Sequence, residues 1–178
     1  MRLKLSLFVM AVLLVVTPAA FGQFAASGTT NVKVTVAAEA AISVNSATPL
    51  TSVGTLFANY TGSTSFSYKV RTKATGGSGA ITAQVTTDFS PVGGPSVATP
   101  PTAGDTLSYG CSVSGVGTAC SGSVTASTTA ATSVATFGTN ARSTKAGDSG
   151  TLSWVLVNDP QYQTGDYQAT VTLSISAL

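Results

Sequence analysis

The chain has 178 residues, of which 43% are hydrophobic and only 8% are charged, and it contains no histidine. The absence of histidine excludes the usual serine and cysteine catalytic triads and the histidine-containing zinc sites. Two of the eight basic residues, Arg2 and Lys4, lie at the start, and from residue 23 onward six basic residues balance six acidic ones. A chain with this balance lacks the electrostatic signature of a nucleic-acid-binding protein.

The first segment has the three parts of a secretory signal peptide. Arg2 and Lys4 precede an apolar run over residues 5–16, and small residues follow up to Gly22, which predicts a signal peptide over residues 1–22 and export. An uncleaved anchor is disfavoured because a helix needs about 20 apolar residues to span a bilayer. The mature chain, residues 23–178, is expected to form one domain with no membrane span.

A long alternating pattern follows a short polar leader. Apolar residues occupy every second position of one face, and this period of two is that of a half-buried β-strand. The positions are Val32, Val34, Val36, Ala38, Ala40, Ile42 and Val44. The run is much longer than the usual strand of about 5–6 residues. We therefore expect the strand to bend, to switch sheets or to project beyond the domain.

The next part of the chain predicts a short strand, a loop and a hairpin. The short strand covers residues 53–57 and the loop residues 59–65. Residues 65–73 and 81–89 both alternate, and the glycine-rich residues 76–79 between them are a turn signal. Two alternating runs around such a turn predict a β-hairpin.

A long surface loop and a second hairpin are predicted in the middle of the chain. Residues 90–104 contain four of the seven prolines, which marks a loop. Residues 107–113 alternate as a strand, and residues 120–126 are expected to return beside it. The only two cysteines, Cys111 and Cys120, lie in this hairpin, and in an exported protein they are expected to form a disulfide that staples it. A redox or metal role is disfavoured because no C-x-x-C spacing is present.

The last two strands supply the predicted core. Residues 152–157 are apolar on both faces, as expected of a central strand that is covered from two sides, and Trp154 is expected to be a core residue rather than a ligand platform. The final stretch alternates strictly and predicts a half-buried antiparallel strand. Its core face carries Tyr167, Val171, Leu173 and Ile175.

No catalytic or metal-binding motif stands out. The chain has one glutamate, and its five aspartates are spread among loops and strand ends, so no pair of catalytic carboxylates is predicted and we expect a non-enzymatic protein without a cofactor. Asp148, Asp159 and Asp166 flank the tryptophan strand and are the calcium candidates. Ordinary turn and strand-end roles are the favoured interpretation, because none of these residues shows an established calcium-loop spacing.

Eight or nine short strands separated by turn residues, with no helical period after the signal peptide, predict an all-β fold. Turn signals at this spacing favour an antiparallel β-sandwich, with an up-and-down barrel as the alternative.

The closing strand G-D-Y-Q-A-T-V-T-L, residues 165–173, resembles the last strand of bacterial immunoglobulin-like surface domains and fimbrial subunits, which commonly end in a G-x-Y-x-x-x-V-type strand. The resemblance implies an immunoglobulin-like sandwich at the bacterial cell surface. It also implies a pilus or fibre subunit that assembles by β-strand addition, with residues 23–36 as the donor strand and self-association through Val32, Val34 and Val36. Two features depart from this family. The cysteines lie in a middle hairpin rather than in an early strand. The last strand is also predicted to be complete, so no groove for a donor strand is expected.

Two function classes therefore remain open. The first is a non-enzymatic structural or adhesive surface protein, in which the Val-rich strand mediates self-association or, alternatively, pairs within its own sandwich. The second is an extracellular module that binds a glycan or another ligand through loops at one end. An open sheet edge would favour assembly. A shallow groove lined by Tyr60, Phe89, Tyr109 or Tyr162 would favour sugar binding.

Overall fold

The computed structural model describes residues 27–45 and 47–178, so the predicted signal peptide lies outside the described part of the chain. Residues 35–178 form one compact unit. Residues 27–34, described by themselves, contain no strand and no helix. No helix within the described ranges is long and apolar enough to cross a membrane.

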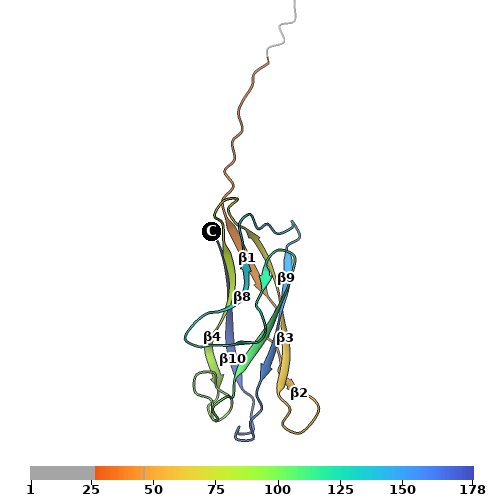
Figure 1. Cartoon of the computed structure of the whole chain (residues 1–178), viewed down its shortest axis with the longest axis vertical. Helices are drawn as coiled ribbons and strands as arrows, with labels where there is room; N and C mark the ends of the chain where they lie inside the picture. Colours follow the sequence, from red (N-terminus) through yellow and green to blue (C-terminus); the bar gives the residue numbers. More distant parts are fainter. Residues whose placement is uncertain (1–26, 46) are drawn as a thin grey trace, which may run out of the picture. The chain divides into compact units, whose positions relative to one another are not determined.

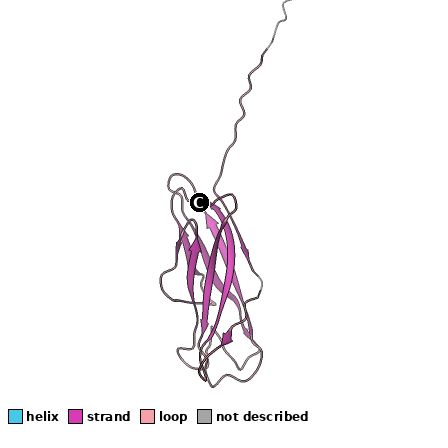
Figure 2. Cartoon of the chain, turned by 90° about the vertical axis from the view of Figure 1, so that its right-hand side faces the viewer, coloured by secondary structure: helices cyan, strands magenta, loops and turns pink. Residues whose placement is uncertain are grey.

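The compact unit is a β-sandwich of two antiparallel sheets (Figures 1 and 2). The larger sheet has the order β1-β3-β9-β5-β7, with β2 paired to β3, and the smaller has the order β10-β4-β8-β6. The larger sheet contains β1 (Glu39–Val44), β2 (Thr51–Ser52), β3 (Tyr60–Arg71), β5 (Leu107–Ser114), β7 (Val124–Thr125) and β9 (Asp148–Leu156). The smaller contains β4 (Gly79–Ser90), β6 (Thr118–Ala119), β8 (Thr132–Phe137) and β10 (Gln168–Ala177). The predicted all-β sandwich is confirmed.

The core lies between the facing sides of the two sheets. Alternate residues of β3, β4, β5 and β9 are buried, as the period of two requires. The largest fully buried side chains are those of Tyr68, Tyr109, Ile81, Leu152, Val85 and Val134. The Tyr109 ring lies edge-on to Trp154, with the ring centroids 5.1 Å apart. This arrangement is a favourable one for two aromatic side chains.

The predicted hairpin of residues 65–73 and 81–89 is wrong. Both strands exist, but β3 belongs to the larger sheet and β4 to the smaller, so the turn between them crosses from one sheet to the other. Backbone bonds tie this crossing to the end of β10: the Leu178 N–H donates to the Ser78 carbonyl at 2.7 Å, and the Lys73 N–H donates to the Leu178 carbonyl at 3.0 Å. A glycine-rich turn marks a reversal of the chain, but it does not specify the sheet in which the next strand pairs.

Several predicted boundaries also differ from the structure. The first strand is only β1, from Glu39 to Val44, while residues 27–38 form no strand. The expected strand over residues 53–57 is a turn, and all but the first residue of the expected loop over residues 59–65 belong to β3. β9 is central in its sheet, but Ser153 is exposed and only one face is fully buried. The outer face of this sheet is therefore open to solvent, as is common for antiparallel sheets.

The predicted disulfide between Cys111 and Cys120 is confirmed, with a Cα–Cα distance of 5.4 Å. The predicted return beside β5 occurs only at β7, where Tyr109 pairs with Val124, and the bridge lies outside this pairing. Cys111 lies in β5 of the larger sheet, whereas Cys120 follows β6 and donates its N–H to the Val134 carbonyl of β8 at 2.9 Å, in the smaller sheet. The bridge therefore links the two sheets. It lies toward the side formed by β7 and β6, away from β1 and β10.

Candidate functional site

A groove of about 1250 Å³ opens between the sheets on the side where β1 and β10 are the edge strands. Val171 and Leu173 of β10 form one wall, and Leu50, from the segment after β1, contributes to the other. Trp154 and Leu156 of β9 form part of the floor. The groove therefore reaches the apolar interior of the sandwich.

The groove exists because β1 ends early. After Val44, the Asn45 N–H donates to the Ser65 carbonyl at 3.1 Å, and the chain leaves the sheet. The following segment lies against β3, where a Cβ on Gly62 would be only 2.5 Å from the carbonyl oxygen of Pro49. Only glycine permits this approach without a shift of the backbone. The segment is therefore held beside β3.

One edge of β10 is left without a strand partner. β10 pairs with β4 along its whole length, and no other strand of the described residues pairs with it. Unpaired N–H and C=O groups on such an edge are a template for another strand. The inward face of β10 is also incompletely covered, because Val171, Leu173 and Ile175 are half-buried where the inward residues of β4 are fully buried. This strand lacks cover on the side of the groove.

Trp154 joins the core to the groove floor. Its side chain is only 6% exposed and packs on Tyr109, yet it also lines the groove. The indole N–H donates to Thr64 Oγ1 at 2.8 Å, and Thr64 Oγ1 is 2.6 Å from Thr48 Oγ1 on the groove wall. A buried indole N–H needs an acceptor. This chain of bonds supplies the acceptor and fixes the wall to the floor.

Tyr167 lies at the rim of the groove, before β10 begins, and is not part of the buried core. Its hydroxyl donates to the Gln163 carbonyl at 2.8 Å. Its ring packs on Gly94, where a Cβ would come within 2.3 Å of the ring carbons. The long loop after β4 is thereby attached to the entrance of β10. Tyr167 shapes the rim rather than filling the interior.

Asp105 and Asp159 form a pair of carboxyl groups near the same end of the sandwich. Asp105 is buried, and its Oδ2 has no hydrogen-bond partner. Burial and the adjacent Asp159 carboxyl raise the pKa of Asp105. Hydrogen bonds from Thr102 Oγ1 and the Gln161 N–H lower the pKa of Asp159. The site therefore favours the neutral form of Asp105, because burial and the Asp159 charge both penalise its ionised form.

We expect Asp105→Asn to raise the Tm at pH 7. A raised folded-state pKa means that the folded protein is destabilised as pH rises from the unfolded value, about 4, through the folded pKa. The asparagine side chain carries no ionisable group and its amide can donate to Asp159 at any pH, so the variant avoids this loss of stability. The difference from wild type should shrink below pH 4, where Asp105 is protonated in both states. Thermal melts followed by circular dichroism between pH 3 and pH 8 measure the Tm difference between the variant and wild type.

The matched control is Asp166→Asn, which removes the same charge at an exposed position of the same end. It should leave the pH dependence of the Tm close to that of wild type. If Asp105→Asn and Asp166→Asn give the same pH profile, burial beside Asp159 does not raise the pKa of Asp105.

The three calcium candidates do not form one site. Asp148 begins β9 and Asp159 follows its other end, so the two lie at opposite ends of the sandwich. Asp148 is buried and accepts from the Val116 N–H at 3.3 Å, while Asp166 is exposed. Within residues 27–45 and 47–178, no group of three or more His, Cys, Asp or Glu side chains could hold a metal ion.

Sequence reasoning missed most of the groove. Leu50, Leu107 and Leu156 line it, and no local pattern distinguishes them from ordinary core or loop residues. The predicted absence of a groove beside the last strand was wrong. Of the four candidate aromatics, Tyr60, Phe89 and Tyr162 line the groove, whereas Tyr109 is buried in the core.

Comparison of the chain with protein-family models, with curated proteins and with solved structures finds no match in any of the three.

Proposed function

We propose that this chain is a secreted, non-enzymatic structural protein of the bacterial cell surface, whose copies assemble into a fibre by β-strand addition. The observation that carries the proposal is an apolar groove beside the unpaired edge of β10 in a chain that also bears an exposed valine segment. We call the segment, residues 32–36, the donor. The signal-peptide pattern and the absence of histidine support the secreted and non-enzymatic parts of the proposal.

The donor has the chemistry that the groove requires. Val32, Val34 and Val36 are 93%, 80% and 62% exposed, and they alternate with Lys33 and Thr35. As a strand, the segment would present all three valines to one face. Its backbone would bond to the free edge of β10 while the valines contact Val171, Leu173 and Trp154. Strand addition of this kind obtains affinity from the main chain and specificity from alternate side chains.

The donor of one copy is expected to enter the groove of another copy, because a tight return beside β1 would leave its valines short of their own groove. The tightest reversal uses two residues, here residues 37 and 38, and would set Val36 beside Glu39 and Val32 beside Ser43. All three valines would then lie along β1. The groove begins only at Val44, where β1 ends. A second copy has no such restriction.

Ligand binding is the second candidate, because Tyr60, Phe89 and Tyr162 line the groove. Aromatic side chains can stack on the apolar face of a sugar. The unpaired edge of β10 favours assembly, since a sugar would leave these backbone groups without a strand partner.

Light scattering on two forms of the chain tests the proposal. Residues 23–178 should form polymers whose size grows with concentration, whereas residues 37–178 should remain monomeric. The shorter form is expected to fold, because residues 27–36 are exposed and contribute no strand. Circular dichroism melts check this. A monomeric long form, or polymers from both forms, would refute assembly through the donor, and a monomeric long form would place ligand binding first.

A further inference from the structure

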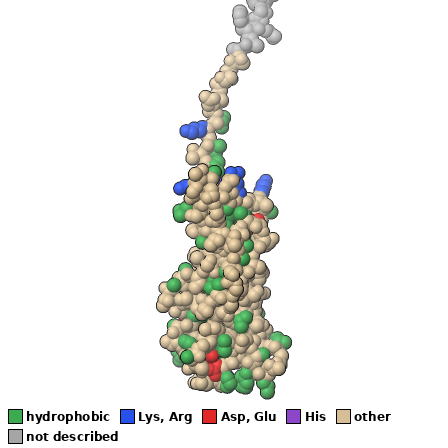
Figure 3. Space-filling model, viewed as in Figure 1, with side chains coloured by type: hydrophobic (Ala, Val, Ile, Leu, Met, Phe, Trp, Pro, Cys, Tyr) green, Lys and Arg blue, Asp and Glu red, His purple; other side chains and the backbone are tan. Residues whose placement is uncertain are grey.

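The charges of the compact unit are separated along the strands. Its basic residues gather where β3 ends and β9 begins, the upper end in Figure 3. They are Lys69, Arg71, Lys73, Arg142 and Lys145, and Glu39 and Asp148 are the only acidic residues with them. We call this the basic end. It carries three more positive than negative charges.

The opposite end carries only negative charge. Its acidic residues are Asp88, Asp105, Asp159 and Asp166, and no lysine or arginine of the described ranges lies there. Asp159 and Asp166 line the groove itself. Asp88, near the end of β4, accepts from the Val97 N–H at 2.8 Å and from the Ser96 hydroxyl at 2.7 Å, both in the loop that follows. We call this the acidic end.

We propose that copies of this chain stack end to end, with the basic end of one copy against the acidic end of the next. The partner at the acidic end, where the groove opens, is therefore a second copy that presents its basic end. This inference rests on the proposed strand addition and names the surfaces that meet around it. Opposite charges on facing surfaces fix orientation and accelerate encounter.

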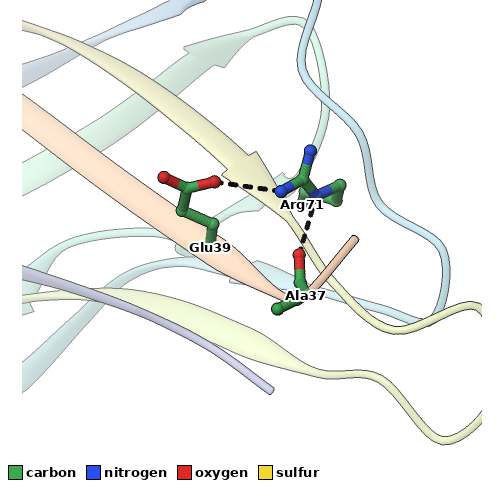
Figure 4. A network of polar contacts seen from close by, with 3 residues as sticks. All are labelled: Ala37, Glu39 and Arg71. Carbon is green, nitrogen blue, oxygen red and sulfur yellow. Dashed lines mark hydrogen bonds and ion pairs between the residues drawn. The ribbon is translucent and has the colours of Figure 1, made fainter. Parts of the chain in front are cut away.

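The point at which the donor joins the sandwich, residues 37–39, supports the stacking. The Arg71 side chain donates from Nε to the Ala37 carbonyl at 2.8 Å and from Nη2 to Glu39 Oε2 at 2.9 Å (Figure 4). The chain is thus tied down at the basic end, immediately after the donor. The donor is therefore continuous in sequence with the basic end of the compact unit.

The short connection brings the two ends together. Only residues 37 and 38 separate Val36 from Glu39, the first residue of β1, and three extended steps cover at most about 11 Å. A donor seated in a neighbouring groove therefore places the basic end near that neighbour's Asp159 and Asp166. This span of at most about 11 Å from Val36 to Glu39 is comparable to the Debye length of about 8–10 Å at physiological salt. The charges of the two ends then interact.

The test measures the assembly rate of residues 23–178 by light scattering. Lys73→Gln/Lys145→Gln removes two exposed charges from the basic end, and Ser65→Glu/Ser112→Glu makes the same net-charge change on the outer face of the larger sheet. At about 20 mM salt, the lysine variant should assemble about tenfold more slowly than wild type, and the serine variant within about twofold. At 1 M salt, where the Debye length is about 3 Å, the three rates should converge. Asp166→Asn should slow assembly in the same salt-dependent way.

Equal rates for the lysine and serine variants at low salt would overturn the stacking and leave strand addition standing. Polymers from residues 37–178 would refute strand addition instead, and the lysine and serine variants of that shorter form would then decide whether end-to-end charge pairing drives its assembly. The two failures are therefore distinguishable.

Discussion

A peptide of residues 29–37 is expected to bind the shorter chain, residues 37–178, and to raise its Tm by roughly 5–10 °C. A ligand that binds only the folded state at 100 times its Kd adds about 2.7 kcal/mol to stability. A domain of this size shifts its Tm by about 2–4 °C per kcal/mol. The peptide would pair with the free edge of β10, with which no strand of the described residues pairs. Calorimetric melts at increasing peptide concentration measure the shift.

The valine at the centre of the donor should be the sensitive position. Burial of one valine side chain contributes about 1.5–3 kcal/mol, and a carboxylate buried in its place needs a partner that the apolar floor does not offer. A peptide with Val34→Asp should therefore bind at least about tenfold more weakly, since 1.4 kcal/mol is a factor of ten.

The matched control is Thr35→Asp, which adds the same charge one position further along. Its side chain would point to the opposite face of the donor strand, away from the groove. This peptide should bind more tightly than the Val34→Asp peptide. Equal losses in the two peptides would show that charge alone decides binding, and that the valines do not enter the groove.

The alternation of apolar and polar residues is the signal from which the sequence could predict strands. β10 and the second half of β3 alternate strictly, and both are strands with one inward face. The first half of β3 was missed because Thr61, Gly62 and Ser63 are small residues with the composition of a loop. Their strand conformation comes from pairing with β9, where Gly62 lies opposite Trp154. Tertiary context of this kind overrides local propensity.

The groove could not be predicted for a related reason. The apolar pattern from Val32 to Val44 is unbroken, so nothing in the sequence indicates that only its second half pairs with β3. The end of β1 depends on the later segment around Pro49, which lies against Gly62. The contact between Asp105 and Asp159 joins two distant loops and likewise has no local signal. Long-range contacts determine the site, whereas local periodicity determines the strands.

Removal of the disulfide by Cys111→Ala/Cys120→Ala should lower the Tm by roughly 5–12 °C. On the chain-entropy model, a loop of this length, with the cysteines nine positions apart, gives about 2.5–3 kcal/mol, and each kcal/mol corresponds to about 2–4 °C here. The bridge holds β5 of one sheet to the end of β6 in the other, and β6 has only two residues. Thermal melts of oxidised wild type and of the double variant measure the loss.

The position of the bridge also predicts what its loss leaves intact. The disulfide ties the sheets toward the side of β7 and β6, whereas the groove opens on the side of β1 and β10. At a temperature well below its Tm, the double variant should therefore bind the donor peptide with nearly the wild-type Kd. Val171→Asp on β10 is the contrasting variant, because it changes the groove wall and spares the bridge. A double variant that is folded but no longer binds would show that the bridge also holds the groove side in place.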